Sequence, residues 1–143
     1  MTLALQEAEG ASAHGDIPIG AVVIDADGVV IARAHNQRER DQDPTAHAEM
    51  LALRAAATER GTWRLDGCTV VVTMEPCPMC AGAIGQARVD AVVFGAWNEE
   101  YGAAGSRWDL LRDRRLAHRP EVVGGVLADE CGTLVRAFLS AMR

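Results

Sequence analysis

Apolar and polar residues alternate in blocks along the chain, and these blocks predict helices and strands in turn. Apolar residues at helical spacing predict a helix over residues 3–13. Two runs rich in β-branched residues, Ile19–Asp25 and Val29–Ala34, flank the turn Ala26-Asp27-Gly28. An Asp-Gly step between two such runs is typical of a β-hairpin. The N-terminal part is therefore expected to form a helix followed by a hairpin.

The middle of the chain returns to alternating helix and strand. Residues 36–43 are polar and are expected to form a loop, which ends at Asp43 as the N-cap of a helix over 44–60. The apolar run Cys68–Met74 predicts a buried strand. The prolines that follow this run predict the start of a second helix, which continues to about Ala87.

The C-terminal part is expected to be less regular. Its predicted elements are a strand over Ala91–Phe94, a glycine-rich loop over 97–106, a short helical turn over 108–111, a strand over Val122–Val126 and a helix over Ala128–Met142. This alternation favours an α/β protein with a mixed sheet and helices on both faces. No linker or repeat interrupts the sequence, so we expect one domain over residues 1–143.

Composition and charge exclude several classes of protein. Hydrophobic residues make up 49% and charged residues 24%, which is typical of a globular domain and not of a disordered chain. The sequence has neither an apolar run of membrane length nor a basic export signal, so we expect a cytoplasmic protein without a membrane partner. The net charge of −6 argues against nonspecific nucleic-acid binding. The arginines between residues 112 and 119 are then expected on a solvated helix face.

His47, Cys77 and Cys80 carry the clearest candidate chemistry. The two cysteines form a Cys-x-x-Cys pair at the start of one predicted helix, and His47 lies near the start of another. Two thiolates and one imidazole suit zinc. Because three protein ligands leave one coordination position for water, this set favours a catalytic site over a structural one. Glu49 follows the histidine by two residues, and its carboxylate can carry protons to and from that water.

Each piece of this pattern, taken alone, is more often structural. The combination of both pieces, with prolines on either side of Cys77, favours catalysis. A zinc-stabilised binding module is the non-enzymatic alternative, and it requires a fourth protein ligand such as Cys68, Cys131 or His35. Cys68 and Cys131 are otherwise expected to be buried thiols. The remaining histidines are expected on the surface or in loops without a catalytic role (His14, His35 and His118).

The pattern His-x-Glu with Pro-Cys-x-x-Cys is the known signature of zinc-dependent nucleobase deaminases. More specifically, the chain resembles the bacterial tRNA-specific adenosine deaminases of the cytidine and deoxycytidylate deaminase-like superfamily. The resemblance covers nearly the whole chain. It is carried by Ile17–Val22, Asn36, Asp43–Glu49, Thr73–Ala83, Val93–Ala96, Gly102–Ser106, His118-Arg119 and Gly125–Cys131.

This resemblance implies a three-layer α/β/α fold around a five-stranded mixed sheet. It implies one Zn2+ per subunit held by His47, Cys77 and Cys80, with Glu49 as the proton shuttle. The implied reaction is hydrolysis of adenosine to inosine at the wobble position of an arginine tRNA anticodon, in which water attacks C6 of adenine and ammonia leaves.

The resemblance also implies contacts with substrate and with a second subunit. Asn36 matches a position that contacts the target nucleotide, and Pro18 and Val22 would line the base pocket. The family acts as a homodimer that binds the tRNA anticodon stem-loop near the subunit boundary. This offers the arginines between 112 and 119 a role in phosphate contacts, as an alternative to a solvated face.

Asn98 departs from the family pattern, in which an aspartate is usual at this position and a lysine often follows. Here Glu99 and Glu100 follow instead, and their negative charge opposes nucleic-acid binding. An amide can donate hydrogen bonds and does not repel phosphate. We therefore hypothesise that Asn98 contacts the substrate and relaxes the preference for RNA over single-stranded DNA. The alternative is drift in a tolerant loop.

Sister enzymes with the same zinc chemistry provide the alternative functions. They deaminate a free nucleoside or nucleobase, and a further alternative is adenine in single-stranded DNA. Ala81-Gly82-Ala83 after the second cysteine, together with the Gly-Ala-Ala-Gly loop that starts at Gly102, favours the tRNA enzyme.

Overall fold

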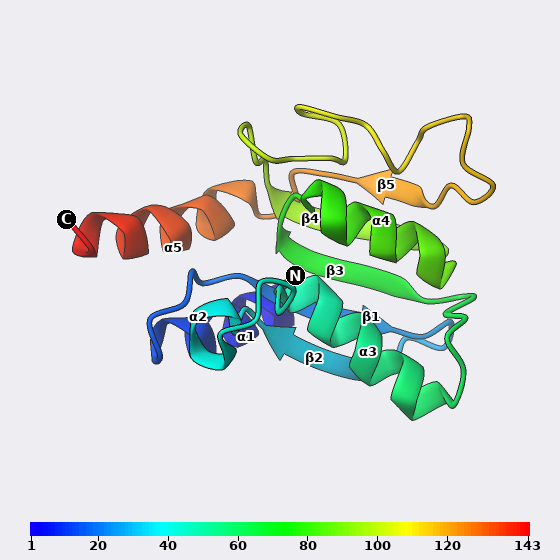
Figure 1. Ribbon diagram of the computed structural model, residues 1–143, viewed down its shortest axis with the longest axis horizontal. Coiled ribbons are helices and arrows are strands. Elements are labelled where there is room, and N and C mark those ends of the chain that lie inside the picture. The colour runs from blue at the N-terminus through cyan, green and yellow to red at the C-terminus, as the bar shows by residue number, and fades with distance from the viewer.

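A five-stranded sheet in the order β2-β1-β3-β4-β5 forms the middle layer of the computed structural model, which describes residues 1–143 (Figure 1). β1 pairs antiparallel with β2 and β3, whereas β3, β4 and β5 run parallel. The sheet is therefore mixed, as predicted. Its strands are β1 Gly20–Ile24, β2 Val30–His35, β3 Thr69–Met74, β4 Ala91–Ala96 and β5 Glu121–Val123.

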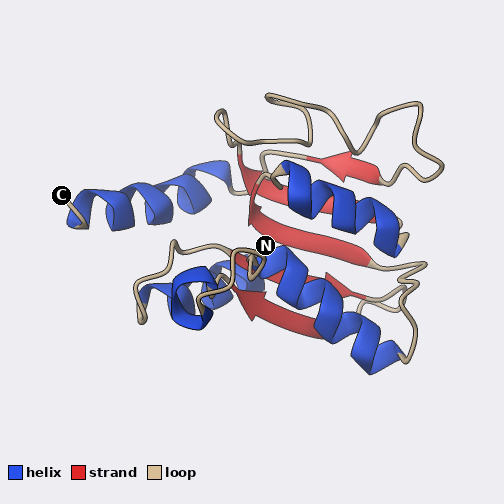
Figure 2. Ribbon diagram, in the orientation of Figure 1, coloured by secondary structure: helices blue, strands red, loops and turns tan.

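Helices cover both faces of this sheet, which confirms the predicted three-layer α/β/α architecture (Figure 2). The helices are α1 Thr2–Ser12, α2 Arg38–Asp41, α3 Ala48–Arg60, α4 Pro78–Ala87 and α5 Ala128–Ala141. α5 projects past the carboxyl ends of β3 and β4, beyond the body of the sheet (Figure 1). None of the helices combines the length and the apolar character that a membrane span requires.

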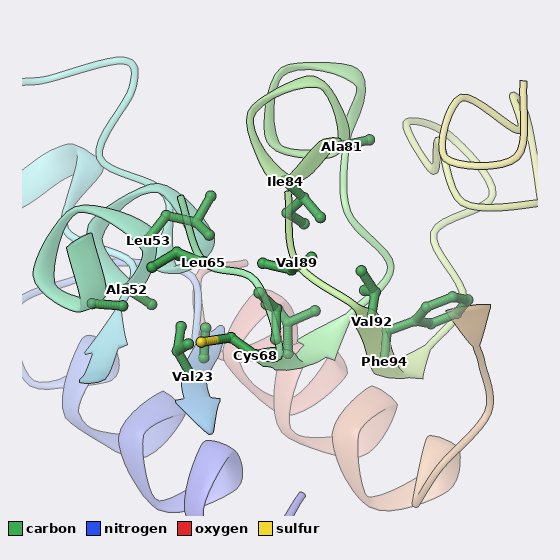
Figure 3. Close-up of a cluster of buried hydrophobic side chains, with 14 of the residues drawn as sticks. Val23, Ala52, Leu53, Leu65, Cys68, Ala81, Ile84, Val89, Val92 and Phe94 are labelled. Atoms are coloured by element: carbon green, nitrogen blue, oxygen red, sulfur yellow. The ribbon is translucent and has the colours of Figure 1, made fainter. Parts of the chain in front are cut away.

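Strand alternation divides the core between the two faces of the sheet. The larger cluster lies under α3 and α4, where Ala52 and Ile84 meet strand residues such as Val23 and Phe94 (Figure 3). A smaller cluster lies under α1 and contains Ala4, Val22 and Val71. The face with the larger cluster therefore carries the two helices whose N-termini hold the predicted metal ligands.

Two glycines let the helices of the other face approach the sheet closely. A Cβ atom at Gly20 would overlap the backbone of α1 at Ala4 and Ala8. A Cβ atom at Gly95 would overlap the Cys131 side chain of α5. The absence of a side chain at both positions thus brings α1 and α5 against β1 and β4.

The prediction of a helix over 44–60 is wrong at its start, because α3 begins at Ala48. Asp43 caps a turn instead of the helix, and its Oδ1 accepts hydrogen bonds of 2.8 Å from both the backbone N–H and the hydroxyl of Thr45. The chain then stays extended through His47, with φ −72° and ψ 152°. This delay makes His47 the N-cap residue of α3.

Four further predictions need correction. The expected loop over 36–43 contains the single helical turn α2. The expected helical turn over 108–111 is absent, because Asp109 forms an isolated antiparallel bridge with Ala104. No helix covers residues 112–119, so the arginines there lie in a loop and not on a helix face. The last strand also ends at Val123, before two glycines, and not at Val126.

Candidate metal and substrate site

His47, Cys77 and Cys80 meet where the N-termini of α3 and α4 lie beside the end of β3. The Nδ1 atom of His47 lies 3.7 Å from the Sγ atom of Cys77 and 3.5 Å from that of Cys80. Tetrahedral zinc, with Zn–S of about 2.3 Å and Zn–N of about 2.0 Å, would separate such atoms by about 3.6 Å. The donor set and its spacing therefore fit zinc.

The local sequence explains how these side chains become available. His47 and Cys77 are the N-cap residues of their helices, and neither side chain caps its own helix by a hydrogen bond. Cys80 lies in the first turn of α4, where the positive end of the helix dipole favours a thiolate. Pro78 is the first residue of α4. Proline fits this position because an N–H group there would have no hydrogen-bond partner within the helix.

The two thiols differ in acidity because the Cys80 thiol donates its proton in a hydrogen bond to Cys77. The hydrogen bond from Cys80, supported by His47, lowers the pKa of Cys77 to about 4. The same hydrogen bond and burial raise the pKa of Cys80, and the Cys77 contact raises the pKa of His47. A divalent cation would displace this proton and hold both sulfurs as thiolates.

Glu49 lies in the first turn of α3 and faces the same site. Its side chain is buried, and burial raises its pKa to about 7. A carboxyl group with a pKa near neutrality can both accept and donate a proton at physiological pH. Glu49 is not part of the cluster of possible metal ligands, so it is available for proton transfer.

A cavity of about 780 Å³ is lined by His47, Glu49 and Cys77. Apolar wall residues come from the segment before β1, from the end of β3 and from α5, and include Ile17, Met74 and Leu139. Arg38 and Asn98 contribute polar groups. An apolar cavity with a few polar groups beside a candidate metal centre can hold a planar base next to the reacting groups.

Glu75 has a role that the sequence analysis missed. Its carboxylate is buried and accepts hydrogen bonds from the backbone N–H groups of Asn98, Ala104 and Ser106, at 2.9–3.0 Å. The Ser106 hydroxyl donates a further hydrogen bond of 2.6 Å. Glu75 thereby ties the glycine-rich loop to the end of β3. A carboxylate that directly follows a buried strand was the available signal, since such a group must find partners.

Asp16 has a similar role on the other side of the cavity. It is buried and accepts the backbone N–H groups of Glu39 and Arg40, at 2.7 and 3.1 Å. These bonds hold the start of α2, which presents Arg38 to the cavity. The partners lie more than twenty residues away in sequence, so no local pattern could indicate this contact.

The residues predicted to bind substrate fall in different places. Asn98 lines the cavity, and its Oδ1 accepts a 3.0 Å hydrogen bond from the N–H of Tyr101. Asn36 lies behind the wall, where it donates to the carbonyl of Ile17 and accepts from the N–H of Arg38. Pro18 and Val22 are buried and do not line the cavity; Val22 packs in the small core cluster under α1.

The other sequence-derived candidates lie away from the metal ligands. Cys68 and Cys131 are buried free thiols, as predicted. The cluster of possible metal ligands contains three residues, and neither these cysteines nor His35 belongs to it. The binding module with a fourth protein ligand therefore lacks that ligand. His118 lies in a loop and bonds the carbonyl of Val89 at 2.6 Å.

Comparison with known proteins yields one family model and several close relatives. Residues 1–96 match the family described as the cytidine and deoxycytidylate deaminase zinc-binding region. The chain is 50% identical over 143 residues to the tRNA-specific adenosine deaminase of Bacillus subtilis strain 168, covering all of this chain and 88% of the relative.

Solved structures agree with this match. A structure from a study of A-to-I editing by tRNA:A34 deaminases at the wobble position has a TM-score of 0.90 and 40% identity, over 94% of this chain and 96% of that one. The guanine deaminase of Nitrosomonas europaea has a TM-score of 0.81 and 27% identity, over 96% and 81%.

Proposed function

The chain belongs to the cytidine and deoxycytidylate deaminase family of zinc-binding enzymes, and on that premise we propose that it hydrolyses adenosine to inosine in tRNA. The single observation that carries this proposal is the buried Glu49 carboxyl beside the His47, Cys77 and Cys80 cluster, at the base of a cavity of about 780 Å³. The likeness to tRNA-specific adenosine deaminases over the full chain selects the substrate class.

The reaction consumes one water and releases ammonia, and Glu49 accounts for its proton transfers. His47, Cys77 and Cys80 would hold the zinc, one ion per subunit. When bound, zinc supplies a water whose pKa falls to about 7. Glu49 would accept one proton of the attacking water and deliver it to the adenine ring nitrogen, and would then transfer the second proton of that water to the leaving amine.

The residues around the cavity explain how the base is held. The apolar side chains of Ile17 and Met74 would provide surfaces for the purine faces, and Asn98 contributes an amide to the cavity lining. Asn36 would hold the cavity wall in place through its hydrogen bonds to Ile17 and Arg38, which both line the cavity. Arg114 and Arg119 form no ion pair within the protein, unlike Arg112 and Arg115, and they are available for phosphate contacts.

We further propose that the target is the wobble adenosine of an arginine tRNA anticodon and that residues 1–143 act as a single deaminase domain. Catalysis would take place in the cytoplasm by a homodimer. Exposed aromatic side chains support a covering partner, since Tyr101 in the cavity lining and Trp97 and Trp108 elsewhere on the surface are all at least 48% exposed. Sedimentation of the free protein and of its complex with the stem-loop measures the subunit count.

The substrate proposal is tested by offering the zinc-loaded protein four substrates in parallel. These are the arginine tRNA anticodon stem-loop, a single-stranded DNA loop of the same sequence, guanine and cytidine. We expect inosine at the wobble position of the RNA and little turnover of the free compounds. Preferred turnover of guanine would instead support the activity of the Nitrosomonas europaea relative.

A further inference from the structure

Two histidines outside the deaminase site face each other through their ring nitrogens. The Nε2 atoms of His14 and His35 lie 3.3 Å apart, and the ring centroids are separated by 5.3 Å. Each Nδ1 atom faces a carboxylate. His14 Nδ1 lies 3.2 Å from Asp16, and His35 Nδ1 lies 3.4 Å from Glu7. The four side chains form a chain of carboxylate, imidazole, imidazole and carboxylate.

This spacing matches what one metal ion requires of two histidine ligands. Two Zn–N bonds of about 2.05 Å at a tetrahedral angle place the nitrogens about 3.3 Å apart. A histidine that binds a metal almost always donates its other N–H to a carboxylate, a carbonyl or water. Both rings have such a carboxylate partner, Asp16 for His14 and Glu7 for His35.

We propose that His14 and His35 form a second binding site for a divalent transition-metal ion of the zinc class. The ion would bind both Nε2 atoms, with water in its remaining positions. Imidazole suits zinc, copper and nickel better than it suits magnesium or calcium. The site shares no residue with the His47 cluster and does not depend on the proposed deaminase function.

The surroundings leave room for such a site and give it access to solvent. The side chains of His14 and His35 are 26% and 20% exposed. A Cβ atom at Gly10 would lie only 3.1 Å from the Cε1 atom of His35, so the glycine makes space for this ring. The ion would join the turn after α1 to the end of β2.

The site also connects to the cavity through Asp16. The carboxylate that faces His14 also accepts the N–H groups of Glu39 and Arg40 in α2, and Arg38 of the same helix lines the cavity. A bound ion fixes His14 with its Nδ1–H directed at Asp16. Occupancy would therefore stabilise the segment that carries Arg38.

The alternative occupant of the space between the two rings is a proton. With both Nδ1–H groups donated to carboxylates, one Nε2 carries a proton and the other accepts it. Metal binding displaces that proton and involves no oxidation or reduction. The two occupants compete for the same position between the rings.

The experiment uses the full chain already holding zinc at the His47 cluster, titrated with Zn2+ against a chromogenic chelator. We expect a second equivalent to bind to the wild type. His14→Asn and His35→Asn should each weaken the second equivalent at least tenfold, whereas the control His118→Asn should not. The first equivalent and the circular dichroism spectrum should be unchanged in all variants. A single equivalent in the wild type would overturn the proposal, and so would a second equivalent that both variants retain.

A measurement on the wild type alone covers the case in which a variant fails to fold. Substoichiometric Ni2+ added to the zinc-loaded protein should broaden the imidazole NMR signals of His14 and His35 and leave those of His118 sharp. Equal broadening of all three histidines, or none, would contradict the site.

Discussion

The Oγ atom of Ser106 donates a 2.6 Å hydrogen bond to Glu75 Oε2, so the glycine-rich loop is fixed directly to the strand end that leads into the metal ligands. The same oxygen accepts the N–H of Asn98, and Oε1 accepts the N–H groups of Ala104 and Ser106. The position of Asn98 in the cavity lining therefore depends on Glu75.

Glu75→Gln should loosen this loop without affecting the metal ligands. Glutamine offers one acceptor oxygen in place of two, so the N–H of Asn98 would face an amide NH2 group. Leaving such a buried donor unpaired costs about 1–3 kcal/mol, and the smaller change Ser106→Ala should cost about 1 kcal/mol. Denaturant unfolding measures both values. The prediction fails if Glu75→Gln is as stable as the wild type, or if it loses zinc.

Cys77 should be the most reactive thiol of the metal-free protein. Its pKa of about 4 makes it a thiolate at pH 7, whereas burial raises the pKa of Cys131. Iodoacetamide should therefore modify Cys77 first, and zinc should protect it. Mass spectrometry of peptides after timed quenching locates the modification. Equal labelling of Cys131 would contradict the lowered pKa of Cys77. A lack of protection by zinc would contradict the assignment of Cys77 as a metal ligand.

Asn98→Asp tests whether the amide sets the preference between RNA and DNA. The Oδ1 atom of Asn98 caps the N–H of Tyr101, and an aspartate can make the same bond. The fold should thus be unchanged, but the Nδ2 donor is lost and a negative charge is added. We expect a larger ratio of RNA to DNA turnover in the variant on matched stem-loops. An unchanged ratio would leave drift in a tolerant loop as the explanation.

Asp16→Asn should reveal an acid-sensitive contribution to stability. Burial raises the pKa of Asp16, but the N–H groups of Glu39 and Arg40 outweigh it, so the pKa lies below the usual 3.8. A depressed pKa stabilises the fold at pH values above 3.8, and this stabilisation is lost as pH falls through the lower folded value. At pH 7 the variant should lose about 1–3 kcal/mol. Urea unfolding between pH 7 and pH 2 should show the difference in unfolding free energy between the wild type and the variant becoming smaller. A difference that stays constant would contradict the role of the Asp16 carboxylate charge.

The candidate metal ligands and the layers of the fold could be predicted because their signals are local. Cys77 and Cys80 are three residues apart on one helix, and the apolar run that becomes β3 directly precedes them. The order of helices and strands was enough to indicate a mixed sheet with two covered faces.

The features that the sequence did not predict depend on distant partners. The turn α2 forms because Asp16 accepts the N–H groups of Glu39 and Arg40, and the glycine-rich loop is held by Glu75. The Asp43-Pro44 pair has the local pattern of a helix start, yet Asp43 caps a turn with Thr45. The local preference for a helix start at Asp43-Pro44 is overridden here by tertiary contacts, which place His47 beside the cysteines.

The most direct test compares the wild type with Glu49→Gln on the arginine tRNA anticodon stem-loop, with zinc content and inosine measured in the same samples. Glutamine preserves the shape of the side chain but cannot transfer protons. We predict equal zinc content in both proteins, inosine at the wobble position with the wild type, and a rate lower by about 10²–10⁴-fold in the variant. Inosine formed equally fast by both proteins would contradict the role of Glu49, and its absence with the zinc-loaded wild type would contradict the substrate.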